Sequence, residues 1–570
     1  MKSFKIIGLT LLFFFVSGIS GSSNSISSNP LNSSDGFKGP NYVKGEVIVK
    51  YKKGVPDERI NGLHQRMNAI KKRDIPNLRI QSVKIPDFMS VEDAIEQYKN
   101  DPDIEYAEPN YILRAFVIPN DTNFTNLWGL NQTSDADIDA PEAWDITTGS
   151  SSVVVAVIDS GVANHTDLAA TNIWTNTGET SCVDGVDNDG NGYIDDCHGW
   201  NFLDNTNDPT DYNSHGTHVA GTIAAIGNNN NGITGVMWNA QIMPLRYLGV
   251  SGSGDTANAI SAINYAANNG ARIINASWGG GPYSQVLYDA INYARGRNVL
   301  FVAAAGNDGT NNDTTPAYPA SYNLDNIISV AATDQNDALA SFSNRGATSV
   351  DLAAPGVNIY SSIPVFSYGA ATTLYSRNFD ADTVGLVPSG WTRGGTNSTW
   401  AVNNASSNSA LNSLVDSPAA NYANNTNAYV LNNSLFSREV SYNKAYFLNF
   451  NRRQYLENGY DYLYVVASPD NSNWYAFWAD STTTIASFTA TAVNLTGAAE
   501  GFNNFYFGFW LQTDASNIND GVYLDDVQLV SRPMSISSYS YTYYQGTSMA
   551  SPHVAGVAGL VISRNPLLTY

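Results

Sequence analysis

Hydrophobic and polar positions follow three different patterns along the chain. In residues 41–116, alternating apolar and polar positions such as Gly45–Tyr51 are separated by stretches with helical spacing. The first helical stretch includes Leu63 and Ile70, and the second opens at Ser90 with a capping pattern. These segments predict a small α+β unit of the βαββαβ kind.

The pattern changes after this unit. From about residue 128 to residue 364, short apolar runs such as Val153–Ile158 alternate with alanine-rich helical stretches such as Thr256–Asn269. Continuous apolar strands with interleaved helices are typical of a parallel sheet covered on both faces. Residues 371–535 show aromatic and threonine-rich alternation with almost no helical pattern, which predicts an all-β sandwich. The α/β pattern returns at Gly546–Asn565.

The N-terminal segment has the features of an export signal. Residues 1–23 combine a positively charged start, an apolar run and small residues, which predicts a secretory signal peptide, with an uncleaved anchor as the alternative. Residues 24–40 are rich in Ser, Asn and Gly and are expected to form an unstructured linker. No later stretch is long and apolar enough to span a bilayer. We therefore expect a secreted protein with no membrane association after signal removal.

Charge is distributed unevenly over the 570 residues. The chain has a net charge of −22 and 14% charged residues, against a usual share of about 25%. Residues 41–115 are balanced, with 13 Lys and Arg against 12 Asp and Glu, whereas residues 116–570 carry 13 against 38. A strongly acidic body repels nucleic-acid phosphate and favours cations. This excludes nucleic acid as an expected partner and favours bound calcium.

Three segments carry candidate chemistry. Asp159 follows the apolar run Val153–Ile158, at the carboxyl end of a predicted parallel strand, where the sites of such sheets collect. His215 opens a helix of small residues, and the nearby His218 lacks the spacing and the glutamate of a zinc-binding helix. Ser548 lies at a helix N-terminus, whose N–H groups favour a developing oxyanion. Serine becomes nucleophilic when a base takes its proton and a carboxylate orients that base, so the three segments together predict a catalytic triad.

The same segments carry a family resemblance. Val157–Gly161, His215–Gly221 and Gly546–His553 resemble the three signatures of the subtilisin-like serine proteases, the subtilases. The resemblance covers roughly residues 120–365 and 537–570. It implies an α/β fold with a subtilisin-like parallel sheet, and a triad in which Asp159 orients His215, His215 acts as general base and then general acid, and Ser548 attacks the peptide carbonyl.

The resemblance also implies residues that stabilise and hold the substrate. Asn307 ends a segment that resembles the family's oxyanion-hole strand, and its amide donor is worth about 3 kcal/mol in the transition state. Two short segments look like the backbone edges that hold an extended peptide: Ser277, Trp278 and Gly279, and Gly252, Ser253 and Gly254. Trp278 either narrows a subsite or packs against the sheet.

Domain boundaries follow from these patterns. Residues 41–116 are similar to the family's inhibitory propeptide, with a permanent small domain as the alternative, and maturation is expected between Leu113 and Asn120. The catalytic domain then covers residues 117–370 and 536–570. Residues 371–535 form an inserted, jelly-roll-like β domain, which either acts on substrate at the cleft rim or has a stabilising or spacing role. The chain ends at Tyr570, where the family usually continues with further helices, so a truncated C-terminus is one interpretation.

One loop has the spacing of a calcium site. Side-chain oxygens alternate, with Gly192 at the sixth position, through the candidate ligands Asp187, Asp189, Asn191, Tyr193 and Asp195. The twelfth position is His198 instead of Glu, which argues against a full EF-hand, and a merely solvated loop is the alternative. Cys182 and Cys197, the two cysteines of the chain, bracket the loop and are expected to form a disulfide in an oxidising environment.

The sequence thus predicts a secreted serine endopeptidase made as a self-processed zymogen. The expected partners are protein or peptide substrates and the chain's own propeptide, and we expect a monomer. Calcium is the expected structural ion, with no organic cofactor. The alternative is a catalytically silent extracellular binding protein on a subtilase scaffold.

Overall fold

The computed structural model describes residues 4–5, 42–112, 118–168, 170–439 and 441–570. The chain divides into two compact units. One comprises Met1–Ser23, Pro119–Ala143 and Thr147–Tyr570, and the other Asn24–Ile118 with Trp144–Ile146. Within the described ranges, no helix combines the length and apolar character needed to cross a membrane. The predicted signal peptide and linker lie outside these ranges, apart from Phe4–Lys5, which form strand β1.

The N-terminal unit has the predicted βαββαβ order. An antiparallel sheet with strand order β3-β4-β2-β5 carries both helices. Ser90 caps the second helix by accepting the N–H of Asp93, as the capping pattern predicts. Ile70 is exposed and starts a strand, so its assignment to the first helix was wrong: that helix ends at Arg66, one turn earlier. The elements are β2 (Tyr42–Tyr51), α1 (Asp57–Arg66), β3 (Ile70–Ile75), β4 (Ile80–Lys84), α2 (Val91–Lys99) and β5 (Ile104–Tyr111).

The second unit is built on a seven-stranded parallel sheet, as the apolar runs predict. Its strand order is β12-β11-β10-β9-β6-β8-β7, with β6 in the interior. The strands are β6 (Gly149–Asp159), β7 (Trp200–Asn201), β8 (Asn239–Arg246), β9 (Ile273–Ala276), β10 (Leu300–Ala304), β11 (Ile327–Thr333) and β12 (Leu352–Pro355). The helices of this part are α3 (Ala140–Trp144), α4 (His215–Ala224), α5 (Thr256–Asn268), α6 (Gln285–Gly296) and α8 (Thr547–Arg564).

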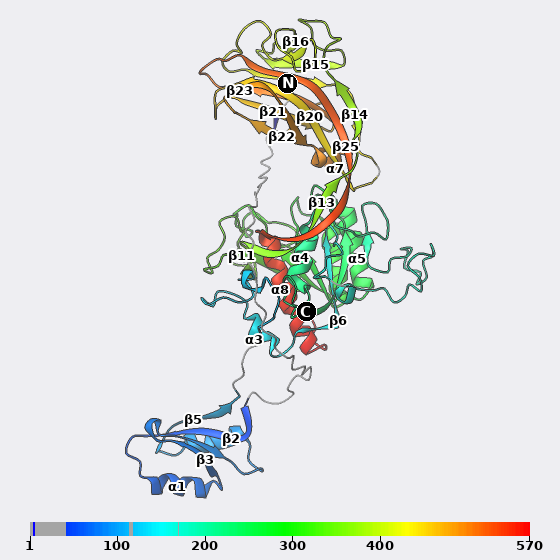
Figure 1. The fold of residues 1–570 in the computed structure, drawn as a ribbon. Helices are drawn as coiled ribbons and strands as arrows, with labels where there is room; N and C mark the ends of the chain where they lie inside the picture. Colours follow the sequence, from blue (N-terminus) through cyan, green and yellow to red (C-terminus); the bar gives the residue numbers. More distant parts are fainter. Residues whose placement is uncertain (1–3, 6–41, 113–117, 169, 440) are drawn as a thin grey trace. The chain divides into compact units, whose positions relative to one another are not determined.

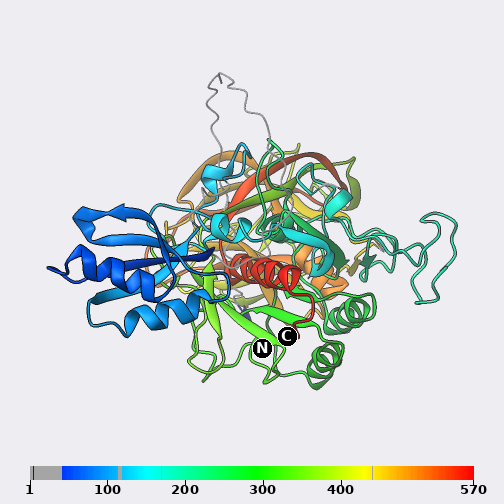
Figure 2. The same cartoon turned by 90° about the horizontal axis from the view of Figure 1, so that it is seen from below.

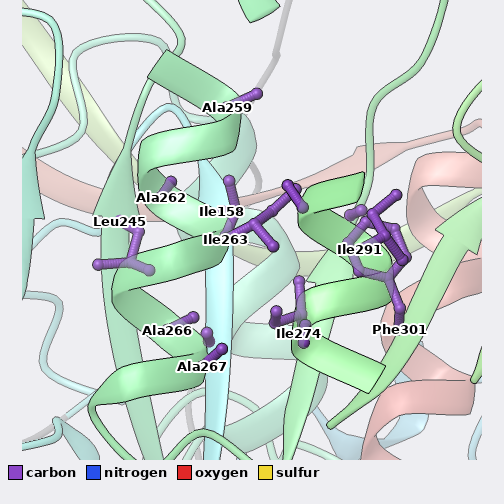
Figure 3. Packing of buried hydrophobic residues seen from close by; sticks show 14 of the residues in the cluster. Ile158, Leu245, Ala259, Ala262, Ile263, Ala266, Ala267, Ile274, Ile291 and Phe301 are labelled. Carbon is purple, nitrogen blue, oxygen red and sulfur yellow. The ribbon is translucent and has the colours of Figure 1, made fainter. Parts of the chain in front are cut away.

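Helices cover both faces of this sheet. Alternate residues of the strands, such as Ile158 and Phe301, pack in one buried cluster with α5 and α6. Figure 3 shows this packing, with Ala262, Ile263 and Ala266 of α5 against the strands. Helices α4 and α8 contact each other and the sheet. In Figure 2 the red helix α8 lies apart from the green helices α5 and α6. Because successive side chains of a strand point to opposite faces, the strand residues that do not face α5 and α6 point to the face that carries α4 and α8.

Residues between β13 (Ile359–Tyr368) and α8 form the predicted β-sandwich. One sheet has the order β22-β21-β24-β18-β15 and the other β16-β17-β25-β20-β23, and residues of both meet in one apolar core. The strands are β14 (Thr372–Arg377), β15 (Trp391–Thr396), β16 (Ala401–Asn403), β17 (Ser413–Val415), β18 (Asn427–Asn432), β19 (Phe436–Ser437), β20 (Lys444–Tyr455), β21 (Tyr462–Ser468), β22 (Trp474–Asp480), β23 (Thr484–Asn494) and β24 (Asn504–Gln512). One short helix, α7 (Thr496–Phe502), was not expected from the sequence.

A long two-stranded ribbon joins the sandwich to the helices of the parallel sheet. Strand β25 (Gly521–Tyr544) pairs with β20 in the sandwich and then with β13 (Ile359–Tyr368), and Figure 1 shows it as one continuous strand. It runs through the predicted boundary at 535/536 without a break and ends three residues before α8 begins. The sandwich is therefore connected to the helix that carries Ser548 by an antiparallel ladder.

Candidate active site

Asp159 and His215 are brought together from two elements. Asp159 is the last residue of β6 and is fully buried, and His215 is the first residue of α4. Nδ1 of His215 lies 2.8 Å and 3.0 Å from the two carboxylate oxygens of Asp159. With Nδ1 donating to the carboxylate, Nε2 is left as the proton acceptor.

The environment of His215 sets its protonation. Burial by itself lowers the pKa of His215, but the negative charge of Asp159 and its hydrogen bond, with a contribution from Asp211, outweigh burial and raise this pKa above its usual value. The environment of His215 therefore favours its protonated, imidazolium form.

A second buried carboxylate, Asp211, shapes the start of α4. One oxygen of Asp211 accepts the N–H groups of Asn213 and Ser214 and the hydroxyl of Ser160, and the other accepts the N–H and hydroxyl of Thr217. These bonds satisfy donors that the first turn of a helix leaves unpaired. Asp211 thereby fixes the backbone on both sides of the histidine, and burial raises its own pKa.

Ser548 is the second residue of α8, where the helix contains an internal proline. Pro552 has no N–H, so it cannot make the helical hydrogen bond to the carbonyl of Ser548 four residues earlier. The hydroxyl of Ser277 donates to that carbonyl instead, at 2.8 Å. Ser277 follows β9, so the end of the parallel sheet supports the backbone of Ser548 at the point where the helix does not.

Ser277 has a further contact with Ser548. The Ser548 hydroxyl donates to the main-chain carbonyl of Ser277 at 2.9 Å. Beneath it, Asn275 donates to the Ser277 hydroxyl, which also lies 2.8 Å from that of Ser551. Ser277 therefore binds Ser548 at both its hydroxyl and its carbonyl.

Asn307 and Ser548 present two amide donors on one side of Gly546. The side-chain oxygen of Asn307 accepts the N–H and the hydroxyl of Thr547 at 2.9 Å and 3.0 Å, so its NH₂ group points away from Thr547. A methyl group placed on Gly546 would lie 3.6 Å from both Nδ2 of Asn307 and the main-chain nitrogen of Ser548. The two nitrogens therefore lie close to the same point, as the donors of an oxyanion hole must.

The ribbon strand β25 contacts the histidine segment as well. The Tyr544 hydroxyl lies 2.8 Å from the Ser214 hydroxyl, and its ring stacks on His218 with centroids 4.5 Å apart. Nε2 of His218 lies within hydrogen-bonding distance of the carbonyls of Ile359 and Thr542, and burial lowers the pKa of His218 to about 3. His218 is thus a neutral packing residue, which leaves no role for it in a zinc site.

The two predicted substrate edges lie at the ends of β8 and β9, outside the strands. Gly252, Ser253 and Gly254 form an exposed turn before α5. Trp278 packs edge-on against Tyr247 and Phe301, and its indole N–H donates to the carbonyl of Ile158 at 2.8 Å. Trp278 therefore packs next to the end of the strand that carries Asp159, and a role in a substrate subsite stays a prediction. Gly279 follows it close to the carbonyl of Tyr318.

The disulfide between Cys182 and Cys197 is present and closes the acidic loop. Of the five predicted ligands, Asp187 accepts N–H groups of Gly190, Asn191 and Gly192, while Asp195 accepts those of Asp184 and Gly185. Asn191 donates its side-chain amide to Asp189 and Asp196, and Tyr193 packs against Tyr265. These contacts fold the loop around its own acidic side chains.

A different set in this loop can hold a metal ion. One carboxylate oxygen each of Glu179, Asp189 and Asp196 lie within 4.8 Å of one another. Glu179 is 8% exposed, and its Oε2 atom is buried without a hydrogen-bond partner. Three carboxylates with an unpaired buried oxygen fit a hard divalent cation, because such cations prefer oxygen ligands. Asp189 belongs to this set and to the predicted one.

Comparison with known proteins identifies the family. The sequence model of the subtilase family, Peptidase S8, matches residues 150–386 and 382–570. The chain belongs to the subtilase family and is a serine endopeptidase. A second model, the fervidolysin N-terminal prodomain, matches residues 28–110 of this subtilase.

Two relatives with similar sequences agree with this assignment. The subtilase is 39% identical over 340 residues to a thermophilic serine proteinase of Bacillus sp. strain AK1, an alignment that covers 59% of this chain and 76% of the relative. It is 40% identical over 273 residues to thermitase of Thermoactinomyces vulgaris, covering 48% and 85%. Among solved structures, proteases from Pseudoalteromonas arctica align with a TM-score of 0.41 and 24% identity, covering 80% of this chain and 89% of the other.

Several residues of this site were not found from the sequence. Asp211 precedes the histidine helix by four residues, and a helix-start signal at that position could have indicated it. Glu179 and Asp196 lie 17 residues apart along the chain and meet only because the loop folds back. Thr547 was part of the serine motif, but its contact with Asn307 joins segments 240 residues apart.

Proposed function

We propose that this protein is an extracellular endopeptidase that cleaves protein substrates through Asp159, His215 and Ser548. The observation that carries the proposal is the paired contact of His215 Nδ1 with both oxygens of Asp159. This contact leaves Nε2 free to accept the proton of Ser548. The Ser548 oxygen then attacks the scissile carbonyl carbon, and the positive charge gained by the imidazole is balanced by Asp159.

The oxyanion and the leaving group are handled by neighbouring groups. The carbonyl oxygen becomes negatively charged as the tetrahedral intermediate forms, and the side-chain NH₂ of Asn307 and the N–H of Ser548 donate to it. His215 gives its proton to the leaving amine, which leaves an acyl group on Ser548. A water molecule then loses a proton to His215 and attacks the acyl carbon, which releases the acid product and restores the hydroxyl.

Substrate is held as an extended chain in this proposal. The backbones of Ser277–Gly279 and Gly252–Gly254 lie outside the strands of the described sheet. Their N–H and C=O groups that are bonded neither within the turn nor to Ser548 can pair with a peptide on either side. Backbone pairing gives affinity with little sequence selection. Peptides and unfolded proteins are the substrates that fit.

The N-terminal unit acts as an inhibitory propeptide. Its separate compact fold and its match to a prodomain model support this role. The proposed mature enzyme begins between Leu113 and Asn120, a segment that lies partly outside the described residues. Residues 1–23 are the signal peptide, residues 24–40 the linker and residues 41–116 the propeptide. The catalytic domain comprises residues 117–370 and 536–570, with the β domain at 371–535, and the secreted enzyme is a monomer.

Calcium stabilises the disulfide-closed loop. Glu179, Asp189 and Asp196 would hold the ion, and the net acidity of the protease region adds a favourable long-range field. The ion lies in the loop and takes no part in the bond cleavage described above.

The function is tested by hydrolysis of unfolded casein in the presence of calcium. We expect the wild type to cleave casein, the Ser548→Ala variant to be inactive, and residues 1 to about 116 to be lost only in the active protein. An inert wild type after separate removal of the propeptide would instead support the silent binding protein.

A further inference from the structure

The inserted sandwich reaches the proposed substrate turn through one buried carboxylate. Glu500 lies in α7, the short helix of the sandwich, and is 8% exposed. Its carboxylate oxygens accept the N–H groups of Val250 at 2.9 Å and of Ser251 at 2.7 Å. Val250 and Ser251 immediately precede Gly252–Gly254, one of the two segments proposed to bind the peptide.

The turn itself is shaped to receive this carboxylate. Gly249 accepts the N–H of Gly252 and donates to the carbonyl of Ser253, so the turn closes on itself through its inner groups. Glu500 accepts the N–H groups of Val250 and Ser251, which lie between the residues joined by these bonds. A methyl group on Gly249 would lie 2.6 Å from a carboxylate oxygen of Glu500, so a larger residue at this position would displace the carboxylate.

The opposite side of the same peptide connects to the catalytic histidine. The carbonyl of Val250 accepts a hydrogen bond from the Asn213 side chain at 2.8 Å, and the oxygen of that side chain accepts the N–H of His215. The segment is therefore held between Asn213 on the catalytic side and Glu500 on the sandwich side.

A buried cation lies close to this contact. Arg246, at the end of β8, is 1% exposed and donates to the carbonyl of Tyr442 in the sandwich at 2.7 Å. The N–H of Tyr442 donates to Asp204 of the catalytic body at 3.1 Å. Burial raises the pKa of Glu500, while the hydrogen bonds from Ser251 and Val250 and the charge of Arg246 act against this rise. The contact between the sandwich and the catalytic domain thus contains the opposite charges of Glu500 and Arg246, and each side contributes hydrogen-bonded backbone groups.

We propose that Glu500 is a positioning residue for substrate binding: the inserted β domain holds the turn Gly249–Gly254 in the conformation that pairs with the peptide. The inference rests on the proposed role of Gly252–Gly254 as a substrate edge. Glu500 touches neither the substrate nor the reacting atoms, so its loss affects the binding of extended substrates and leaves the acylation chemistry intact.

The test compares two carboxylates of the sandwich that each accept two backbone N–H groups. Glu500 binds those of the turn, whereas Asp470 binds those of Ser472 and Asn473 within its own loop. The full chain, after its own maturation, is prepared as wild type, Glu500→Ala, Glu500→Gln and Asp470→Ala. Each protein is assayed with a fluorogenic ten-residue peptide and with a small sulfonyl fluoride that reacts with the nucleophilic serine.

For Glu500→Ala we expect KM for the peptide to rise about tenfold, the size associated with hydrogen bonds to a charged group. We expect kcat and the rate of sulfonyl fluoride labelling to stay at wild-type values. Glu500→Gln keeps the side-chain volume and one oxygen acceptor, so it should give an intermediate KM. Asp470→Ala should leave KM unchanged. Equal KM values in all four proteins, or a fall of kcat without a rise of KM, would overturn the proposal.

Amide hydrogen exchange provides a readout that needs no activity. The N–H groups of Val250 and Ser251 should exchange faster in Glu500→Ala than in wild type and Asp470→Ala, and unchanged exchange would contradict the contact. If the wild type neither cleaves the peptide nor reacts with the sulfonyl fluoride, the proposed protease mechanism fails, while the exchange rates still decide whether Glu500 holds the turn.

Discussion

The side-chain oxygen of Asn307 accepts both the main-chain N–H and the hydroxyl of Thr547, the residue that precedes the proposed nucleophile. The hydroxyl of Thr547 in turn accepts the N–H of Gly306. These hydrogen bonds fix the orientation of the Asn307 side-chain amide, with its oxygen toward Thr547 and its NH₂ group on the other side. The donor of the proposed oxyanion hole is thus preorganised by the same helix that carries Ser548.

The Asn307→Asp substitution tests this arrangement. An aspartate keeps the oxygen that binds Thr547 but has no N–H to give to the oxyanion, and it adds a negative charge. We expect kcat for peptide hydrolysis to fall by about 10²- to 10³-fold with little change in KM. Thr547→Val, which removes only the hydroxyl, should reduce kcat far less. Steady-state kinetics of the two variants checks this, and wild-type kcat in Asn307→Asp would rule out the donor role.

Ser277 replaces a hydrogen bond that Pro552 cannot make. In Ser277→Ala the carbonyl of Ser548 loses its side-chain donor in a buried setting, which costs about 1–3 kcal/mol of unfolding free energy. We expect this loss in urea unfolding measured in a Ser548→Ala background, where self-digestion is absent. Substituting the exposed Ser253 by alanine should change the unfolding free energy little and serves as the control. Equal stability of both variants would contradict the account of the helix start.

The pH dependence of kcat/KM follows from the Asp159 and His215 pair. Catalysis needs the neutral imidazole, and the pKa of His215 is raised by Asp159, so activity should fall on acidification with a midpoint above about 6.5, the ordinary histidine value. In Asp159→Asn the raising charge is gone, so the midpoint should move to lower pH while kcat drops about 10⁴-fold. A midpoint that is the same in both proteins would assign the acid limb to another group.

Calcium binding to the loop can be measured without activity. In a Ser548→Ala background, calcium at about a hundredfold above its Kd should stabilise the fold by about 2.7 kcal/mol relative to chelator. Glu179→Gln should remove most of this difference, and Asp184→Asn, in the same loop but outside the group of three carboxylates, should retain it. Differential scanning calorimetry gives the shift. A full calcium effect in Glu179→Gln but none in Asp187→Asn would favour the ligand set expected from the spacing.

Much of the architecture could be predicted from local sequence patterns. The apolar run before Asp159 predicts a buried parallel strand, and the structure places it inside a parallel sheet with helices on both faces. The assignment of Ile70 to a helix was wrong because its apolar side chain matches the spacing of Leu63, yet it is exposed at the start of an edge strand. Apolar spacing alone does not indicate where a helix ends, and this helix ends at Arg66.

The contacts that join distant segments could not be read from the sequence. Helix α7 contains Gly497 and Gly501, which weaken its helical pattern, and it is stabilised by packing in the sandwich core. Glu500 within it is one acidic residue among many until the fold places it on the turn at Val250 and Ser251. The replacement of a helical bond by Ser277 likewise depends on tertiary structure.

The most direct test of the central claim is intact-mass and peptide mapping of the matured chain after treatment with a serine-directed sulfonyl fluoride. The account predicts a single adduct on Ser548, with loss of casein hydrolysis in proportion to labelling. It predicts much slower labelling in His215→Ala, because the hydroxyl then lacks its base. Labelling of other serines at equal rates, or an unlabelled Ser548 in a protein that still cleaves casein, would contradict the proposed mechanism.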